Sequence, residues 1–259
     1  ALWAIADSPL ATAAQRLRLA TTTSTEASGL LAVLLPRLEQ QTGRTVAVIA
    51  VGTGKALRLA ERGDVDVVLV HAPAAEEAFV ANGFGVNRRA VMKNDFVILG
   101  PPGDPAEVKG MRVVAAALRK IARAGAPFVS RGDDSGTHQR EKALWSAAAI
   151  KPSGSWYLEV GMGMGECLLM ANEKRAYVLS DRGTYLAYVS KLDLEVVVQG
   201  DAALLNPYSV IAVNPARHPH VDYAGALSLI SWLTSKQGQK LIGDFRRSGR
   251  QLFTPDAIP

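Results

Sequence analysis

Residues 130–138 bring together the residue types that bind a small anion. An apolar run at 126–129 precedes them and a helical pattern at 139–149 follows, which predicts a strand, a loop and a helix start. Backbone N–H groups at a helix start, together with the hydroxyls of Ser135 and Thr137, can donate to one anion. Arg131 adds a guanidinium that can bind two anion oxygens, and Gly136 lets the backbone come close.

The same segment allows two other interpretations. In the binding interpretation, Asp133 or Asp134 braces Arg131 or caps the helix. In the first alternative, the segment is only a helix cap with a surface Arg–Asp ion pair. In the second, Ser135, His138 and Asp134 form a catalytic set. Three neighbours on one helical turn rarely point at one another, so we interpret Ser135 as a hydrogen-bond donor and expect no enzyme.

Three further strand–loop–helix junctions are rich in glycine or hydroxyl residues, and α/β folds bind ligands at such junctions. The alternatives are an ordinary helix cap at the first, a plain turn at the second and a flexible loop giving one backbone N–H at the third. A separate candidate, Arg182, either faces the ligand cleft or pairs with Asp181. The junction residues are Thr22, Thr23 and Ser24; Thr53 and Gly54; and Met164 and Gly165.

The third predicted strand, at 65–70, ends at His71 and Pro73 without a carboxylate. A ligand that carries a proton needs an acceptor, whereas a fully deprotonated oxyanion needs donors only. This junction therefore favours an oxyanion without a proton.

The bulk composition narrows the function classes. A chain of 259 residues with 48% hydrophobic residues can form two lobes of about 100–150 residues each. The net charge of +5 suits an anionic ligand, but basic residues do not alternate with aromatic ones, so we do not expect nucleic-acid binding. The single cysteine, Cys167, excludes a disulfide within the chain, and we expect it to be buried. The scattered histidines offer no zinc motif, and the sequence contains no transmembrane span.

The order of the predicted elements indicates an α/β protein. Residues 17–81 alternate strand and helix three times, which predicts a parallel sheet covered by helices. Strands are expected at 86–92 and 95–99, after which the pattern restarts. A last apolar strand at 208–213 precedes helices at 221–234 and 236–245. Residues 1–15 resemble the tail of an export signal or an N-terminal extension.

Five ordered segments give the chain a specific resemblance. It resembles the tungstate-binding proteins of bacterial tungstate ABC transporters (the TupA type) over nearly all of 16–259. The resemblance implies a two-lobed periplasmic binding protein type II fold, in which each lobe is a central mixed sheet flanked by helices and two strands cross between the lobes. The segments are 19–30, 51–54, 64–73, 130–138 and 181–185.

The resemblance implies a first lobe from 16–93 and 209–259 and a second lobe from 94–208, with crossings at 95–99 and 208–213. Residues 130–138 also resemble the anion loop of phosphate-binding proteins. Those proteins carry an aspartate just before the proline of the third-strand loop, where this chain has Ala72 preceded by His71. That difference favours tungstate or molybdate over phosphate.

The function implied is that of a high-affinity receptor that closes on the oxyanion and delivers it to the permease of an ABC transporter. It would act in the periplasm or on the outer surface of the membrane. We expect a monomer with no cofactor and no metal bound by side chains. A receptor for sulfate or phosphate, and a serine hydrolase, remain alternatives. The implied ligand-binding residues are Thr22, Thr23, Ser24, Thr53 and Gly54 in the first lobe, and Arg131, Ser135, Gly136, Thr137, Met164, Gly165 and Arg182 in the second.

Overall fold

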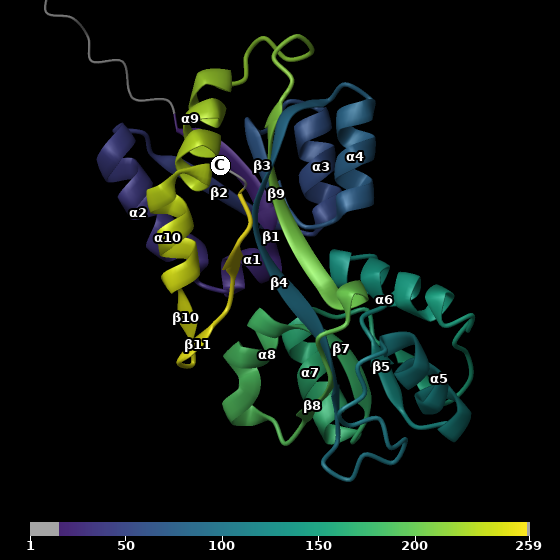
Figure 1. The fold of residues 1–259 in the computed structure, drawn as a ribbon. Helices are drawn as coiled ribbons and strands as arrows, with labels where there is room; N and C mark the ends of the chain where they lie inside the picture. The colour runs from purple at the N-terminus through teal and green to yellow at the C-terminus, as the bar shows by residue number, and fades with distance from the viewer. Residues whose placement is uncertain (1–15, 258–259) are drawn as a thin grey trace, which may run out of the picture.

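The protein folds into two α/β lobes, which lie one above the other in Figure 1. The structure is a computed structural model that describes residues 16–257. The predicted N-terminal extension, 1–15, lies outside the described residues. No helix in the described part of the chain is long and apolar enough to cross a membrane.

The first lobe is built on the parallel strands predicted from the sequence. The strand β1 (Leu17–Thr22) lies between β2 (Val46–Val51) and β3 (Val67–Val70) and pairs with both in parallel. One face of this sheet packs on α3 and α4, and the other packs on α2 and α9 (Figure 1). The helices of this segment are α1 (Thr23–Ala27), α2 (Leu30–Thr42), α3 (Thr53–Glu61) and α4 (Pro73–Ala81).

The strand β4 (Gly85–Gly100) links the lobes. It pairs antiparallel with β9 (Leu205–Val213) as far as Asp95, and then with β7 from Phe96 onward. The sequence predicted two strands, 86–92 and 95–99, and this was wrong because one strand runs on through the polar residues at 93–95. Their side chains have polar partners: Lys93 bonds to Asp256, Asn94 to Asn206, and Asp95 to Arg182.

The second lobe repeats the strand–helix pattern. Its strands β5 and β6 pair in parallel, β5 pairs in parallel with β7, and β7 and β8 each pair antiparallel with β4. The helix α8 (Arg182–Tyr188) was not predicted from the sequence. The elements are α5 (Val114–Ala124), β5 (Phe128–Ser130), α6 (Gly136–Ala147), β6 (Tyr157–Glu159), α7 (Met164–Glu173), β7 (Tyr177–Asp181), α8 (Arg182–Tyr188), β8 (Glu195–Val198) and two 3-10 turns, Val189–Lys191 and Ala202–Leu204.

The last part of the chain returns to the first lobe. The predicted helices are present as α9 (Tyr223–Thr234) and α10 (Lys236–Asp244), and they bury Trp232 and Leu233. Three short strands after them were not predicted: β10 (Arg246–Arg247), β11 (Arg250–Gln251) and β12 (Thr254–Pro255). The strand β12 pairs with β4, so residues 254–255 lie against the crossing strand. Cys167 is fully buried, as the sequence predicted.

Candidate functional site

His71 connects the hydroxyl-rich junction of the first lobe to the crossing strand β9. Its Nε2 atom lies 3.2 Å from the Thr22 hydroxyl oxygen and 3.4 Å from that of Ser24, and its Nδ1 atom lies 2.9 Å from Asn206 Oδ1. The Asn206 amide nitrogen donates to Asn94, so Asn206 Oδ1 accepts from His71 Nδ1–H. His71 Nε2 is therefore an acceptor. Burial lowers the pKa of His71, which keeps the ring neutral.

The two lobes meet where α3 and α6 begin. A Cβ atom on Gly136 would lie 3.2 Å from the Thr53 hydroxyl oxygen and 3.5 Å from His71 Cε1. Thr53 is the first residue of α3 and Gly136 is the first residue of α6. Two helix N-termini, one from each lobe, therefore face the same small space, as expected for a shared anion site.

Three buried polar atoms in the described residues have no hydrogen-bond partner, and all three belong to these junctions. They are Thr53 Oγ1, Ser130 Oγ and Arg131 Nε. Buried polar groups in folded proteins are nearly always paired, because an unpaired one costs roughly 1–3 kcal/mol. The Thr53 hydroxyl at the start of α3 and Arg131 Nε in the loop before α6 are the polar lining that an oxyanion would need, whereas Ser130 at the end of β5 faces Glu141 and Tyr157.

Arg131 is braced as the sequence predicted. Its Nη2 atom donates to Asp133 Oδ2 at 2.5 Å, and Asp133 Oδ1 accepts from the Ser135 backbone N–H at 3.1 Å. Burial alone would raise the pKa of Asp133, but the hydrogen bonds from Ser135 and the charge of Arg131 outweigh it and lower the pKa. Because Asp133 accepts a hydrogen bond from Arg131 Nη2, the Nε–H group of the guanidinium remains available to a ligand.

The start of α6 is capped by Ser135, whose hydroxyl oxygen accepts from the His138 backbone N–H at 3.3 Å. The N–H groups of Gly136 and Thr137 belong to the first turn, where α6 itself offers them no acceptor. The His138 ring nitrogen Nδ1 accepts from the Asp134 N–H at 3.0 Å, and the Ser135 hydroxyl bonds to the backbone of His138 rather than to its ring. These bonds do not align Ser135, His138 and Asp134 for nucleophilic catalysis.

The start of α7 is tied to the Arg131 loop through the backbone. The Gly161 N–H donates to the Arg131 carbonyl at 2.8 Å. Met164 and Gly165 are the first two residues of α7, and both are buried. A Cβ atom on Gly165 would clash with the Tyr188 hydroxyl, so packing against α8 explains why a glycine stands there.

The remaining predicted residues differ in their freedom to reach a ligand. Thr22 Oγ1 accepts from the Thr25 N–H at 3.2 Å and lies 2.6 Å from Thr25 Oγ1, so the Thr22 hydroxyl is engaged inside α1. Thr23 is exposed, and Gly54 follows Thr53 in the first turn of α3.

Arg182 is held in a bidentate ion pair. Its Nε and Nη2 atoms each donate to a carboxylate oxygen of Asp95 at 2.6 Å, and Nη2 also donates to Gln199 Oε1 at 2.9 Å. The alternative pairing with Asp181 is wrong, because Asp181 caps α8 by accepting from Thr184. The arrangement makes Arg182 a brace between β4 and α8.

Comparisons with known proteins agree with this fold. A family model described as a PBP superfamily domain matches residues 9–237. The tungstate-binding protein TupA of Peptoclostridium acidaminophilum is 47% identical over 243 residues, which are 92% of this chain and 85% of that protein. This chain belongs to the TupA family of the PBP superfamily. Its fold is therefore the two-lobed periplasmic binding protein type II fold that the sequence predicted.

Two solved structures of TupA-like proteins are similar along almost their whole length. The tungstate-binding protein TupA from Desulfovibrio alaskensis superposes with a TM-score of 0.85 at 50% identity, over 93% of this chain and 99% of that one. The tungstate ABC transporter structure from Geobacter sulfurreducens superposes with a TM-score of 0.83 at 54% identity, over 90% of this chain and all of that one. Family and fold thus rest on independent matches of sequence and structure.

The position of Ser130 beside Glu141 and the hydrogen bond between His71 and Asn206 were not predicted from the sequence. Ser130 stood beside Arg131 at the end of a predicted strand, which was a usable signal. At His71, the sequence predicted only that the junction after the third strand lacks a carboxylate. Asn206 lies 135 residues from His71, and no local pattern connects the two. Within residues 16–257, no group of three His, Cys, Asp or Glu side chains is placed to hold a metal ion.

Proposed function

We propose that this TupA-family chain is a solute-binding receptor that captures tungstate, and also molybdate, outside the cytoplasm and delivers it to the permease of an ABC transporter. The similarity to tungstate-binding proteins of other organisms supports the ligand. The observation that carries the proposal is that two buried donors, Thr53 Oγ1 at the start of α3 and Arg131 Nε in the loop before α6, have no partner.

The proposed ligand set comes from both lobes. Thr53 and Gly54 donate from the first lobe together with the junction at 22–24, in which Ser24 has the freer hydroxyl. Arg131, Ser135, Gly136 and Thr137 donate from the second lobe, while Met164 and Gly165 contribute backbone N–H groups and Arg182 braces the site. The lobes are proposed to comprise 16–93 with 209–259, and 94–208.

Such a donor set binds a dianion without needing an acceptor for a ligand proton. Charge-assisted hydrogen bonds contribute roughly 1.5–3 kcal/mol each, so several of them support binding in the nanomolar range. Because both lobes donate, the anion stabilises the closed arrangement by contacts that an open one lacks. The closed receptor, a monomer without a cofactor, would then dock on the permease. The bonds of Ser135 and His138 support a receptor rather than a hydrolase.

Isothermal titration calorimetry with tungstate, molybdate, sulfate and phosphate tests the proposal. We expect tight binding of tungstate, with molybdate competing, and weak or absent heat with phosphate. Tight binding of phosphate or sulfate with no heat from tungstate would instead support the alternative receptor for another tetrahedral oxyanion. Hydrolysis of generic esters that is lost in Ser135→Ala would support an enzyme.

A further inference from the structure

Glu141 is a buried carboxyl group on the helix that begins at the proposed anion site. It lies one turn after Thr137 on α6, and only 2% of its surface is exposed. Its Oε1 atom accepts from the Tyr157 hydroxyl at 2.7 Å and from Trp145 Nε1 at 3.2 Å. Among the described residues, no arginine, lysine or histidine forms an ion pair with it.

The groups that face Glu141 do not stabilise its charge fully. Ser130 on β5 and Tyr157 on β6 offer neutral hydroxyls, Glu159 on β6 adds a second negative charge, and the Cys167 thiol on α7 lies within its field. Burial, followed by the charge of Glu159, raises the pKa of Glu141 to about 7 against the hydrogen bonds from its neighbours. The acid is therefore balanced between its neutral and charged forms near neutral pH.

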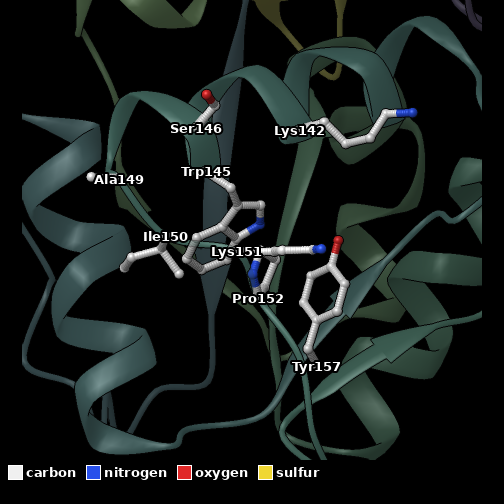
Figure 2. A pocket seen from close by; sticks show the side chains of 8 residues that line it. All are labelled: Lys142, Trp145, Ser146, Ala149, Ile150, Lys151, Pro152 and Tyr157. Carbon is white, nitrogen blue, oxygen red and sulfur yellow. The ribbon is translucent and has the colours of Figure 1, made fainter.

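A surface hollow lies beside the two donors to this carboxyl group. The hollow has a volume of about 480 Å³ and is lined by residues of α6, residues 149–152 and Tyr157 (Figure 2). Trp145 and Tyr157 are the donors to Glu141, so the hydrogen-bonded partners of the buried acid form part of the wall of an open cavity. The cations on its wall are Lys142, which is already paired with Asp134 at 2.6 Å, and Lys151.

We propose that the protein binds its dianion with Glu141 in the neutral form, so that anion binding and protonation of Glu141 are coupled. This inference rests on the proposed oxyanion function of the α6 N-terminus. Below the pKa of Glu141, the acid is already neutral and the anion binds alone. Above it, the carboxylate takes up one proton from solvent as the anion binds. Both hydrogen bonds to the carboxylate go to Oε1, so the proton belongs on Oε2.

Electrostatics favours this coupling, although Arg131, and Arg140 on α6, place positive charge near the junctions. An ionised Glu141 would place a buried negative charge within about two helical turns of the dianion, and each charge would then disfavour the other. The coupling is reciprocal: the free energy by which ionised Glu141 weakens anion binding equals the free energy by which the bound anion raises the pKa of Glu141. Other nearby groups do not titrate in this range, because burial lowers the pKa values of His71 and His138 and raises that of Cys167 to about 11.

The test measures tungstate affinity by calorimetry from about pH 6.5 to about pH 9, where tungstate stays a dianion. We expect the affinity of the unmodified protein to fall about tenfold over this range. Glu141→Gln keeps an oxygen acceptor for Tyr157 and Trp145 but cannot ionise, so its affinity should stay constant. Glu173→Gln, which removes an exposed carboxylate from the same lobe, should behave like the unmodified protein.

Two further measurements separate proton coupling from a packing effect. Titration at about pH 7.5 in buffers of different ionisation enthalpy should show uptake of about half a proton per anion, as a tenfold coupling implies, and this uptake should be absent in Glu141→Gln. Tyr157→Phe removes a donor that stabilises the carboxylate, so the fall in affinity should move to higher pH. A pH-independent affinity without proton uptake in the unmodified protein overturns the coupling and leaves the proposed function standing. Absence of tungstate binding at every pH overturns the function itself.

Discussion

His71 Nδ1 and Asn206 Oδ1 lie 2.9 Å apart, and this hydrogen bond joins the ligand junctions of the first lobe to the strand that returns from the second. Asn206 also donates to Asn94 on β4, so both crossing strands enter the same buried network. The His71 ring stacks on Tyr208 with a centroid separation of 4.6 Å. Polar groups buried at the crossing of two strands fix one arrangement of the junctions, because any other would leave them unpaired.

Protonation of His71 should destabilise the fold. Its folded-state pKa is lowered, so the free energy of unfolding is highest above the unfolded-state value of about 6.5 and falls as the pH drops through the folded-state value. Thermal unfolding from about pH 7.5 to about pH 5.5 should show this loss, and His71→Gln should make the slope shallower. His220→Gln, which changes an exposed histidine, is the control. An unchanged slope in His71→Gln would show that other groups govern it.

Arg131→Ala should weaken tungstate binding at least tenfold, since a charge-assisted hydrogen bond contributes roughly 1.5–3 kcal/mol. Arg131→Lys keeps the charge but loses the planar guanidinium, so it should recover only part of the affinity. Calorimetry on both variants measures the effect, and thermal unfolding checks that the Asp133 loop survives. Unchanged affinity in Arg131→Ala would make Arg131 a structural brace for that loop.

Thr53→Val should separate ligand binding from stability. The Thr53 hydroxyl is buried without a partner, so replacing it with a methyl group of similar size should leave the melting temperature unchanged or raise it. If the hydroxyl donates to the anion, the same variant should lose about tenfold or more in affinity. A variant that is destabilised and binds normally would contradict the ligand role of Thr53.

Gly136→Ala should impair anion binding, because the added methyl group would occupy the space between the lobes. A Cβ at this position would lie 3.2 Å from the Thr53 hydroxyl oxygen, which is closer than an ordinary contact. Alanine is favourable in a helix, so the isolated second lobe should not suffer, but closure on the anion should be hindered. Calorimetry should show weaker binding with an unchanged melting temperature. Gly103→Ala, where a Cβ would meet nothing within 4 Å, is the matched control.

The sequence predicted what depends on local pattern. The strands and longer helices of 17–81 and the brace between Arg131 and Asp133 were correct, because apolar periodicity and short-range pairing decide them, whereas the short helix α1 was not predicted. The unbroken strand β4 was missed because three polar residues interrupt its apolar pattern, and each of them is satisfied by a distant partner. The proximity of Gly136 and Thr53 could not be predicted either, because it depends on how the two lobes pack together and not on local sequence.

The ion pair between Arg182 and Asp95 provides the last prediction. Both bonds are 2.6 Å long and both side chains are largely buried, at 18% and 24% exposed, so the pair should stabilise the junction of β4 and α8. Removing either partner leaves a charge unpaired in a partly buried place, and about 1–3 kcal/mol should be lost from the free energy of unfolding.

A double-mutant cycle distinguishes this bracing from ligand binding. If Arg182 acts only through Asp95, then Arg182→Ala, Asp95→Ala and the double variant should be destabilised to a similar degree, as denaturant unfolding would show. Tungstate affinity should then change equally in all three. If Arg182 also contacts the anion, Arg182→Ala should bind more weakly than Asp95→Ala at equal stability. That result would make Arg182 a ligand-binding residue, because loss of the Asp95 ion pair alone would weaken tungstate binding equally in both single variants.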